Sequence, residues 1–201
     1  MPLLTDQFTR AVDYALRHHA DDLRKGTTIP YASHLLSVAS LVMDMESGSE
    51  DEVIAALLHD VVEDGGGERA RAEIRERFGP DVERMVIENS DSLSGEPEKA
   101  PWRARKEAYI AALAHKSPGG PRVSVADKLH NARAILTDYR THGEALWSRF
   151  KQGEGDSVVW YYRALVEGFE RRADDLGPGG RIALRELDLV VATLEAARDA
   201  G

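Results

Sequence analysis

Residues 50–64, EDEVIAALLHDVVED, form the stretch that decides the fold class of this chain. From Val53 onward the helix that they predict is apolar on almost every side, which is typical of a buried central helix. Gly65 to Gly67 follow directly and predict the end of that helix, because glycine tolerates a positive φ angle. A helix without a broad polar face needs other elements packed around it, so it predicts the centre of a core.

Outward from this stretch, the spacing of apolar residues is helical along nearly the whole chain. The first helix begins near Thr5 and Asp6, either of which can cap it. Further helical patterns cover residues 34–45, 68–78, 81–88, 103–115, 122–139, 143–150, 158–176 and 181–197. We find no alternating run long enough for a strand. The sequence therefore predicts an all-α fold of about eight to ten helices, with residues 1–201 as a single domain.

The composition and charge of the 201 residues exclude several functional classes. The 35 acidic and 26 basic residues give a net charge of −9, which disfavours an extended basic face for nucleic acid. The absence of cysteine excludes disulfides, thiolate metal sites and cysteine nucleophiles. No run approaches the ~18 apolar residues of a membrane span, and the amino terminus lacks the features of a signal peptide. We therefore expect a cytoplasmic protein that binds neither membrane nor nucleic acid.

Four ionisable residues crowd the carboxyl-terminal end of the most hydrophobic helix. His59 and Asp60 follow Leu58 directly, and Glu63 and Asp64 lie one helical turn further on, on the same face. Burying such groups costs several kcal/mol unless each finds a partner. Because the three carboxylates repel one another unless a cation is present, we interpret the group as part of a divalent metal site.

Two further residues complete the candidate metal site. His34 shares a helical face with Val38, so its imidazole should point inward, and Asp127 lies in another apolar helix. Two imidazoles and two carboxylates suit Mn²⁺, Fe²⁺ or Zn²⁺ and leave positions for water and a substrate oxygen. Such an ion favours hydrolysis of a small anionic substrate, even in an acidic protein. Glu63 is the better candidate for the general base, and Asp64 is the next.

Three motifs carry a resemblance to a known family. They are Tyr31-Ala-Ser-His34, Ala55-Ala-Leu-Leu-His59-Asp60-Val-Val-Glu63-Asp64 and Val125-Ala-Asp127-Lys-Leu-His-Asn131. In this order and spacing they resemble the HD-domain metal-dependent phosphohydrolases. More narrowly, they resemble the hydrolase domain of the RelA/SpoT family and the stand-alone small alarmone hydrolases. The resemblance spans about residues 8 to 170 and implies a compact all-α HD-domain fold.

The resemblance also implies roles for the residues of the metal site. One metal ion, usually manganese in this family, would be held by His34, His59, Asp60 and Asp127. Glu63 and Asp64 would orient and activate the attacking water. The sequence departs from the family directly after that pair, because Gly65 stands where the family often has Thr.

A substrate follows from the same resemblance. Asn131 would contact a ribose, while Arg24 and Lys25 would lie against the base and the phosphates. The family removes the 3′-pyrophosphate from guanosine tetra- or pentaphosphate and gives GDP or GTP plus pyrophosphate. Some stand-alone relatives are similar to phosphatases that remove the 2′-phosphate of NADPH, which is the alternative activity. We expect no alarmone synthesis, because the chain has no room for a synthetase domain.

A function of another class is also compatible with the sequence, namely a metal-bound nucleotide-binding or sensor protein with little turnover. The intact Glu63-Asp64 pair counts against it, because a pure binder does not need residues that handle water. We expect His130 to have a structural role, since it lies outside the metal pattern. Residues 90–101 are rich in Ser, Gly, Glu and Pro and therefore form a loop, which is a candidate lid over the site.

Overall fold

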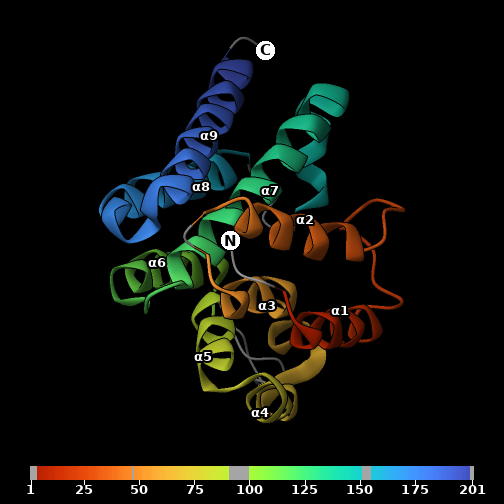
Figure 1. Cartoon of the computed structure of the whole chain (residues 1–201). Coiled ribbons are helices and arrows are strands. Elements are labelled where there is room, and N and C mark those ends of the chain that lie inside the picture. Colours follow the sequence, from red (N-terminus) through yellow and green to blue (C-terminus); the bar gives the residue numbers. More distant parts are fainter. Residues whose placement is uncertain (1–3, 47, 91–99, 151–154, 200–201) are drawn as a thin grey trace.

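A computed structural model describes residues 4–46, 48–90, 100–150 and 155–199, so most of the candidate lid lies outside the described residues. Within these ranges the chain forms nine α-helices and no strand, which confirms the predicted all-α class (Figure 1). The helices are α1 (Asp6–His18), α2 (Ala32–Met43), α3 (Glu50–Leu58), α4 (Gly67–Phe78), α5 (Pro80–Asn89), α6 (Trp102–Ala112), α7 (Gly120–His142), α8 (Gly155–Glu170) and α9 (Ala173–Asp199). The shorter elements are a π-helical turn (Val62–Gly66) and two 3₁₀ turns (Leu113–His115 and Gly143–Arg149).

Helix α3 lies at the centre of the fold, as its sequence predicts. Every side chain from Val53 to Leu58 is at most 1% exposed, and α3 contacts α1, α2, α5 and α7. Ser49 caps its amino terminus, because the Ser49 hydroxyl accepts a hydrogen bond from the Glu52 N–H at 3.3 Å. The acidic residues of the first turn also favour the positive end of the helix dipole. Capping and burial together hold this helix in place, and its carboxyl-terminal end carries His59 and Asp60.

The carboxyl-terminal end of α3 differs from the prediction. The pattern predicts one helix through Asp64, but α3 ends at Leu58 and a turn leads into the π-helical turn. There the Gly66 N–H bonds to the carbonyl oxygen of Val61, five residues back, at 3.1 Å. Asp64 leaves helical angles at φ −94° and ψ 52°, and Gly65 adopts φ +105°. Glycine suits this position better than a β-branched Thr, which adopts a positive φ only with strain.

Helix α7 is the second element that positions the site. It contacts α2, α3, α5, α8 and α9, and it therefore crosses the fold close to the central helix (Figure 1). The predicted pattern at 158–176 divides in the structure, because α8 ends at Glu170 and α9 begins at Ala173. None of the described helices combines the length and the apolarity that crossing a bilayer requires.

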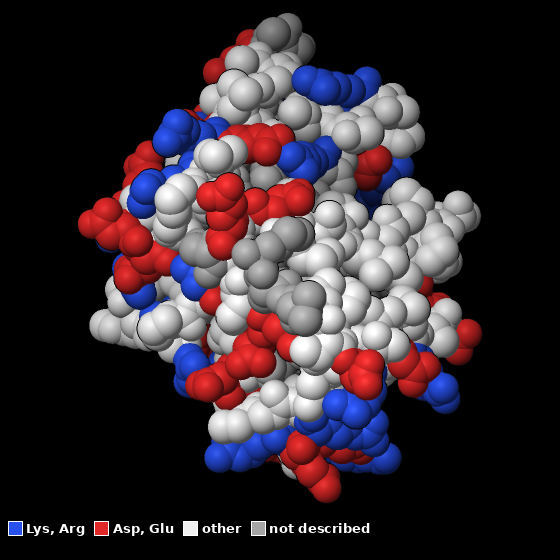
Figure 2. Space-filling view, viewed as in Figure 1, with Lys and Arg blue, Asp and Glu red and all other residues white. Residues whose placement is uncertain are grey.

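Charged side chains are distributed unevenly over the face shown in Figure 2. Basic side chains gather at the end of the molecule that α4 forms, and the arginines of this helix are Arg69, Arg71, Arg75 and Arg77. Both Arg71 and Arg75 pair with Glu83 on α5. The positive charge at this end is therefore partly neutralised by neighbouring carboxylates.

Candidate metal and phosphate site

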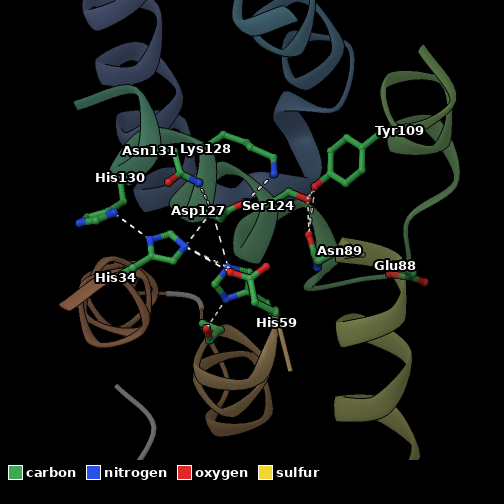
Figure 3. Close-up of polar contacts among 12 residues, drawn as sticks. His34, His59, Glu88, Asn89, Tyr109, Ser124, Asp127, Lys128, His130 and Asn131 are labelled. Carbon is green, nitrogen blue, oxygen red and sulfur yellow. Dashed lines mark hydrogen bonds and ion pairs between the residues drawn. The ribbon is translucent and has the colours of Figure 1, made fainter. Parts of the chain in front are cut away.

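Three of the four predicted metal ligands meet in a buried cluster (Figure 3). His34 lies in the first turn of α2, His59 directly follows α3, and Asp127 lies within α7. The His34 Nε2 atom is 3.2 Å from His59 Nε2 and 3.3 Å from Asp127 Oδ1. One ligand atom from each residue lies within 4.8 Å of the other two. We refer to these three residues as the buried cluster, and its dimensions suit one metal ion.

Asp60, the fourth predicted ligand, lies at the edge of the buried cluster. Its Oδ2 atom is 2.9 Å from His59 Nε2 and 3.6 Å from His34 Nε2. The Tyr31 hydroxyl donates a hydrogen bond to the same oxygen at 2.5 Å. Tyr31 belongs to the first sequence motif, but the motif alone does not reveal that this residue holds Asp60.

The carboxylates and imidazoles of the site perturb one another strongly. Burial opposes a charge on His59, yet the carboxylates of Asp60 and Asp127 outweigh this effect and raise the pKa of His59 well above its usual value. Burial also opposes ionisation of both carboxylates. Nevertheless, His59 lowers the pKa of Asp60 and Lys128 lowers the pKa of Asp127, both well below the usual range. Both carboxylates stay ionised, so a divalent cation can replace the imidazolium proton.

The outer nitrogens of both imidazoles are hydrogen-bonded, which turns their Nε2 atoms toward the cluster. His59 Nδ1 lies 2.8 Å from the carbonyl oxygen of Ala56 and donates to it. His34 Nδ1 lies 2.8 Å from Nδ1 of His130. Burial, together with the neighbouring His34, lowers the pKa of His130 to about 4. If His34 Nε2 is to bind a metal ion, the ring proton of a neutral His34 is on Nδ1, and Nδ1 of His130 then accepts the hydrogen bond that orients this ring.

The predicted catalytic pair reaches the same site from the π-helical turn. Glu63 and Asp64 line a polar cavity of about 200 Å³ together with Asp60 and Asp127. The Asp64 N–H bonds to the Asp60 carbonyl oxygen at 2.8 Å, and His18 Nε2 contacts the Asp64 carbonyl oxygen at 3.2 Å. The bond from Asp64 to Asp60 spans four residues, as in an α-helical turn, and departures from helical angles begin only at Asp64.

Cationic side chains line the same polar cavity. They are Arg24, Lys106 and Lys128. Lys128 Nζ lies 2.6 Å from Asp127 Oδ2. Although burial opposes its charge, Asp127 raises the pKa of Lys128 well above its usual value. One cavity thus contains carboxylates that can bind a metal ion and cationic side chains that can bind an anion. This combination is suited to a phosphate group that binds next to a metal ion.

The three predicted substrate residues lie beside the cluster. Arg24 Nη2 donates to Asn131 Oδ1 at 2.7 Å, and Asn131 Nδ2 donates to Asp127 Oδ1 at 2.6 Å. Lys25 Nζ lies 5.1 Å from the centre of the Phe150 ring. Arg24 and Asn131 are therefore linked to the buried cluster by hydrogen bonds, whereas Lys25 lies against the Phe150 ring.

A second, larger cavity adjoins the polar one. It has a volume of about 460 Å³, and Arg24, Tyr31 and Asn131 line both cavities. Its apolar lining residues include Ile29, Ala134, Ile135, Leu146, Phe150 and Tyr162. Pockets for small ligands measure roughly 300–1,000 Å³ and are mostly apolar. The larger cavity therefore has the size and lining of a site for a small organic ligand.

Comparison with known proteins identifies the family. A family model for the HD domain matches residues 11–154. The chain belongs to the HD-domain family. This membership confirms the resemblance that the three motifs carry, and it agrees with the predicted class of metal-dependent hydrolase.

Several relatives of this HD-domain chain have named activities. Guanosine-3′,5′-bis(diphosphate) 3′-pyrophosphohydrolase MESH1 of Homo sapiens is 38% identical over 134 residues, which cover 64% of this chain and 69% of the relative. The protein of the same name from Drosophila melanogaster is 35% identical over 138 residues, or 67% of this chain and 73% of the relative. GTP pyrophosphokinase rsh of Brucella ovis is 30% identical over 128 residues, or 63% of this chain and 16% of the relative.

Two solved structures share the HD-domain fold. One is described as a metazoan ortholog of SpoT that hydrolyses ppGpp and plays a role in starvation responses. It has a TM-score of 0.71 at 25% identity, over 95% of this chain and 97% of the other. A protein of Listeria monocytogenes EGD-e has a TM-score of 0.64 at 28% identity, over 79% of this chain and 99% of the other.

Proposed function

We propose that this HD-domain protein hydrolyses guanosine 3′,5′-bis(diphosphate), ppGpp, and its pentaphosphate form, with release of the 3′-pyrophosphate. The proposal is carried by the two adjoining cavities, which share Arg24, Tyr31 and Asn131. A nucleotide that spans them places its base in the larger cavity and its scissile phosphate beside the metal ligands. The similarity to the human and fly proteins named MESH1 supports a guanosine bis(diphosphate) as the nucleotide.

The donor atoms of the site fit one divalent transition metal. His34, His59, Asp60 and Asp127 would hold it with two nitrogens and two carboxylate oxygens. We favour Mn²⁺ for this set, and Fe²⁺ and Zn²⁺ are the alternatives. When bound, the ion would lower the pKa of a water molecule by several units and stabilise charge on the phosphoryl oxygens.

Glu63 is our candidate for the group that takes the proton of the attacking water. It lines the polar cavity with Asp60 and Asp127 but is not part of the buried cluster. Asp64, its neighbour in the turn, would orient the same water. The water oxygen attacks the phosphorus bonded to the ribose 3′-oxygen. The bond between this phosphorus and the ribose 3′-oxygen breaks, pyrophosphate leaves, and the 3′-oxygen takes up a proton.

The cations of the site would bind the substrate. Lys106 and Lys128 line the polar cavity and would bind the 3′-pyrophosphate. Arg24 and Asn131, hydrogen-bonded to each other at 2.7 Å, stand where the cavities meet and would contact the ribose and its phosphate. Lys25 lines the larger cavity and would lie against the base and the 5′-diphosphate.

The test follows the products that the purified chain forms from ppGpp in the presence of Mn²⁺. Anion-exchange chromatography separates GDP and pyrophosphate from the products of phosphate release, and NADPH is assayed in parallel. We expect GDP and pyrophosphate in equal amounts, with no reaction after chelation of the metal. Phosphate release from NADPH alone would assign the chain as an NADPH 2′-phosphatase instead. Nucleotide binding without turnover would assign it as a sensor protein.

A further inference from the structure

Lys116 is a buried lysine that takes no part in the mechanism above. It follows the 3₁₀ turn at Leu113–His115 and is 4% exposed. Its ammonium group donates to the backbone carbonyl oxygen of Glu88 at 2.5 Å, to Asn89 Oδ1 at 2.9 Å and to the Tyr109 hydroxyl at 3.3 Å. Three acceptors match the three N–H donors of an ammonium group, so this position is built for a lysine.

Two of the acceptors of Lys116, Asn89 and Tyr109, belong to a buried polar network (Figure 3). The hydroxyl groups of Tyr109 and Ser124 lie 2.9 Å apart, and Ser124 also donates to Asn89 Oδ1. The Asn89 amide donates to the carbonyl oxygen of Met85 at 2.7 Å. Each of these groups has a partner, and buried networks that are satisfied in this way are rigid.

The network forms part of the wall of the polar cavity. Asn89 and Tyr109 line that cavity together with Lys128. Lys128 Nζ lies 4.7 Å from the centre of the Tyr109 ring and 2.6 Å from Asp127 Oδ2. Tyr109 therefore contacts both Lys116, whose Nζ lies 4.5 Å from the ring centre, and a cation that contacts a predicted metal ligand. Lys116 can affect the cavity through these neighbours without lining it.

A role in stability alone does not explain a lysine at this position. Burial and the nearby charge of Lys128 lower the pKa of Lys116 well below its usual value, which shows that its charge is costly to keep there. Buried charges are a poor source of stability, because apolar residues of similar volume often replace a whole buried ion pair without loss. What an apolar residue cannot supply is the two hydrogen bonds from the ammonium group to Asn89 and Tyr109.

We propose that Lys116 is a positioning residue for phosphate hydrolysis, which fixes Asn89 and Tyr109 and, through the Tyr109 ring, the ammonium group of Lys128. The proposal rests on the proposed function for the identity of the reaction. Reacting groups that shift by about 1 Å can lose about 10²-fold in rate. The main effect of removing Lys116 therefore falls on kcat, because the residue does not touch the substrate.

The test compares Lys116→Met with Arg122→Met at saturating Mn²⁺. Arg122 is a matched control, because it is another largely buried cation, paired with Glu52, and it lines neither cavity. We expect Lys116→Met to lower kcat about 10- to 100-fold, with little change of KM and one bound Mn²⁺ per chain. Arg122→Met should lower the Tm and leave kcat near that of the wild type. Equal kcat in the two variants would overturn the proposal.

Two further variants keep the proposal falsifiable if Lys116→Met does not fold. Lys116→Gln retains two N–H donors and should recover part of the lost kcat. Tyr109→Phe keeps the ring but loses the hydroxyl, and it should lower kcat by less than Lys116→Met does. The double variant with Lys116→Gln and Tyr109→Phe should lose less kcat than the product of the two single losses, because both residues act through one network. Unchanged kcat in both single variants would overturn the positioning role.

The choice of substrate separates this proposal from the proposed function. If the wild type does not hydrolyse ppGpp, the proposed function fails. The variants are then compared with NADPH and with p-nitrophenyl phosphate, where a lower kcat in Lys116→Met alone still supports the positioning role. A wild-type chain that hydrolyses none of the three compounds overturns both proposals.

Discussion

Replacing Tyr31 with Phe tests how far metal binding depends on the residue behind Asp60. The Tyr31 hydroxyl donates to Asp60 Oδ2 at 2.5 Å, while His59 Nε2 lies 2.9 Å from the same oxygen. Without the hydroxyl, the carboxylate keeps its contacts with the imidazoles of His59 and His34 but loses the donor that holds it from outside the buried cluster. A hydrogen bond to a charged group contributes about 1.5–3 kcal/mol. The loss of such supporting contacts typically weakens metal binding about 10- to 100-fold.

The assay is a calorimetric titration of the metal-free protein with Mn²⁺, followed by kcat at saturating Mn²⁺. Tyr31→Phe should raise the Kd for Mn²⁺ about 10- to 100-fold. At saturating Mn²⁺, its kcat should be close to that of the wild type. Tyr14→Phe is the matched control, because the Tyr14 hydroxyl also donates to a carboxylate, Glu73 Oε2 at 3.0 Å, but lines neither cavity. A Kd for Tyr31→Phe close to that of the wild type, or an equal loss in the control, would refute the reasoning.

Three further perturbations have defined outcomes. Glu63→Gln should retain bound Mn²⁺ in metal analysis while kcat falls by ~10²–10⁴; loss of the metal would instead make Glu63 a ligand. Because the pKa of His59 is raised in the metal-free cluster, its proton must leave when Mn²⁺ binds. The Kd should therefore fall about tenfold per pH unit up to that pKa and level off above it, and titrations that show no pH dependence would contradict this. Arg122→Met breaks the buried ion pair with Glu52, in which Arg122 Nε donates to Glu52 Oε2 at 2.6 Å. This variant should lower the free energy of unfolding by about 3–5 kcal/mol in urea denaturation. A much smaller loss would show that the pair is not desolvated.

The sequence predicts most of the helices and the candidate ligands for a common physical reason. A helix whose apolar residues surround it must be buried, so the polar residues at its end require partners. This reasoning finds His59 and Asp60 at the end of α3, and the same reasoning on other helices finds His34 and Asp127. The structure brings these four side chains together, although their role as ligands stays a prediction.

The contacts that support the site cannot be read from local pattern. Lys116 stands in a sequence that resembles an ordinary surface turn, and two of its acceptors, Glu88 and Asn89, lie 28 and 27 residues away along the chain. Tyr31 precedes its partner Asp60 by 29 residues. Helical periodicity reports which side of an element is buried, but not which polar atoms another element presents there.

The short stretch after α3 would supply both metal ligands and catalytic groups. The backbone stays close to helical as far as Glu63, because within the π-helical turn only Asp64 and Gly65 depart from helical φ and ψ angles. Glu63 and Asp64 lie in the wall of the polar cavity, and the Asp64 N–H bonds to the Asp60 carbonyl oxygen at 2.8 Å, as it would in an α-helical turn. One backbone hydrogen bond thus connects the group that would bind the ion to the groups that would handle the water. Gly65 follows the pair at φ +105°, an angle that glycine adopts without the strain that a side chain would bring.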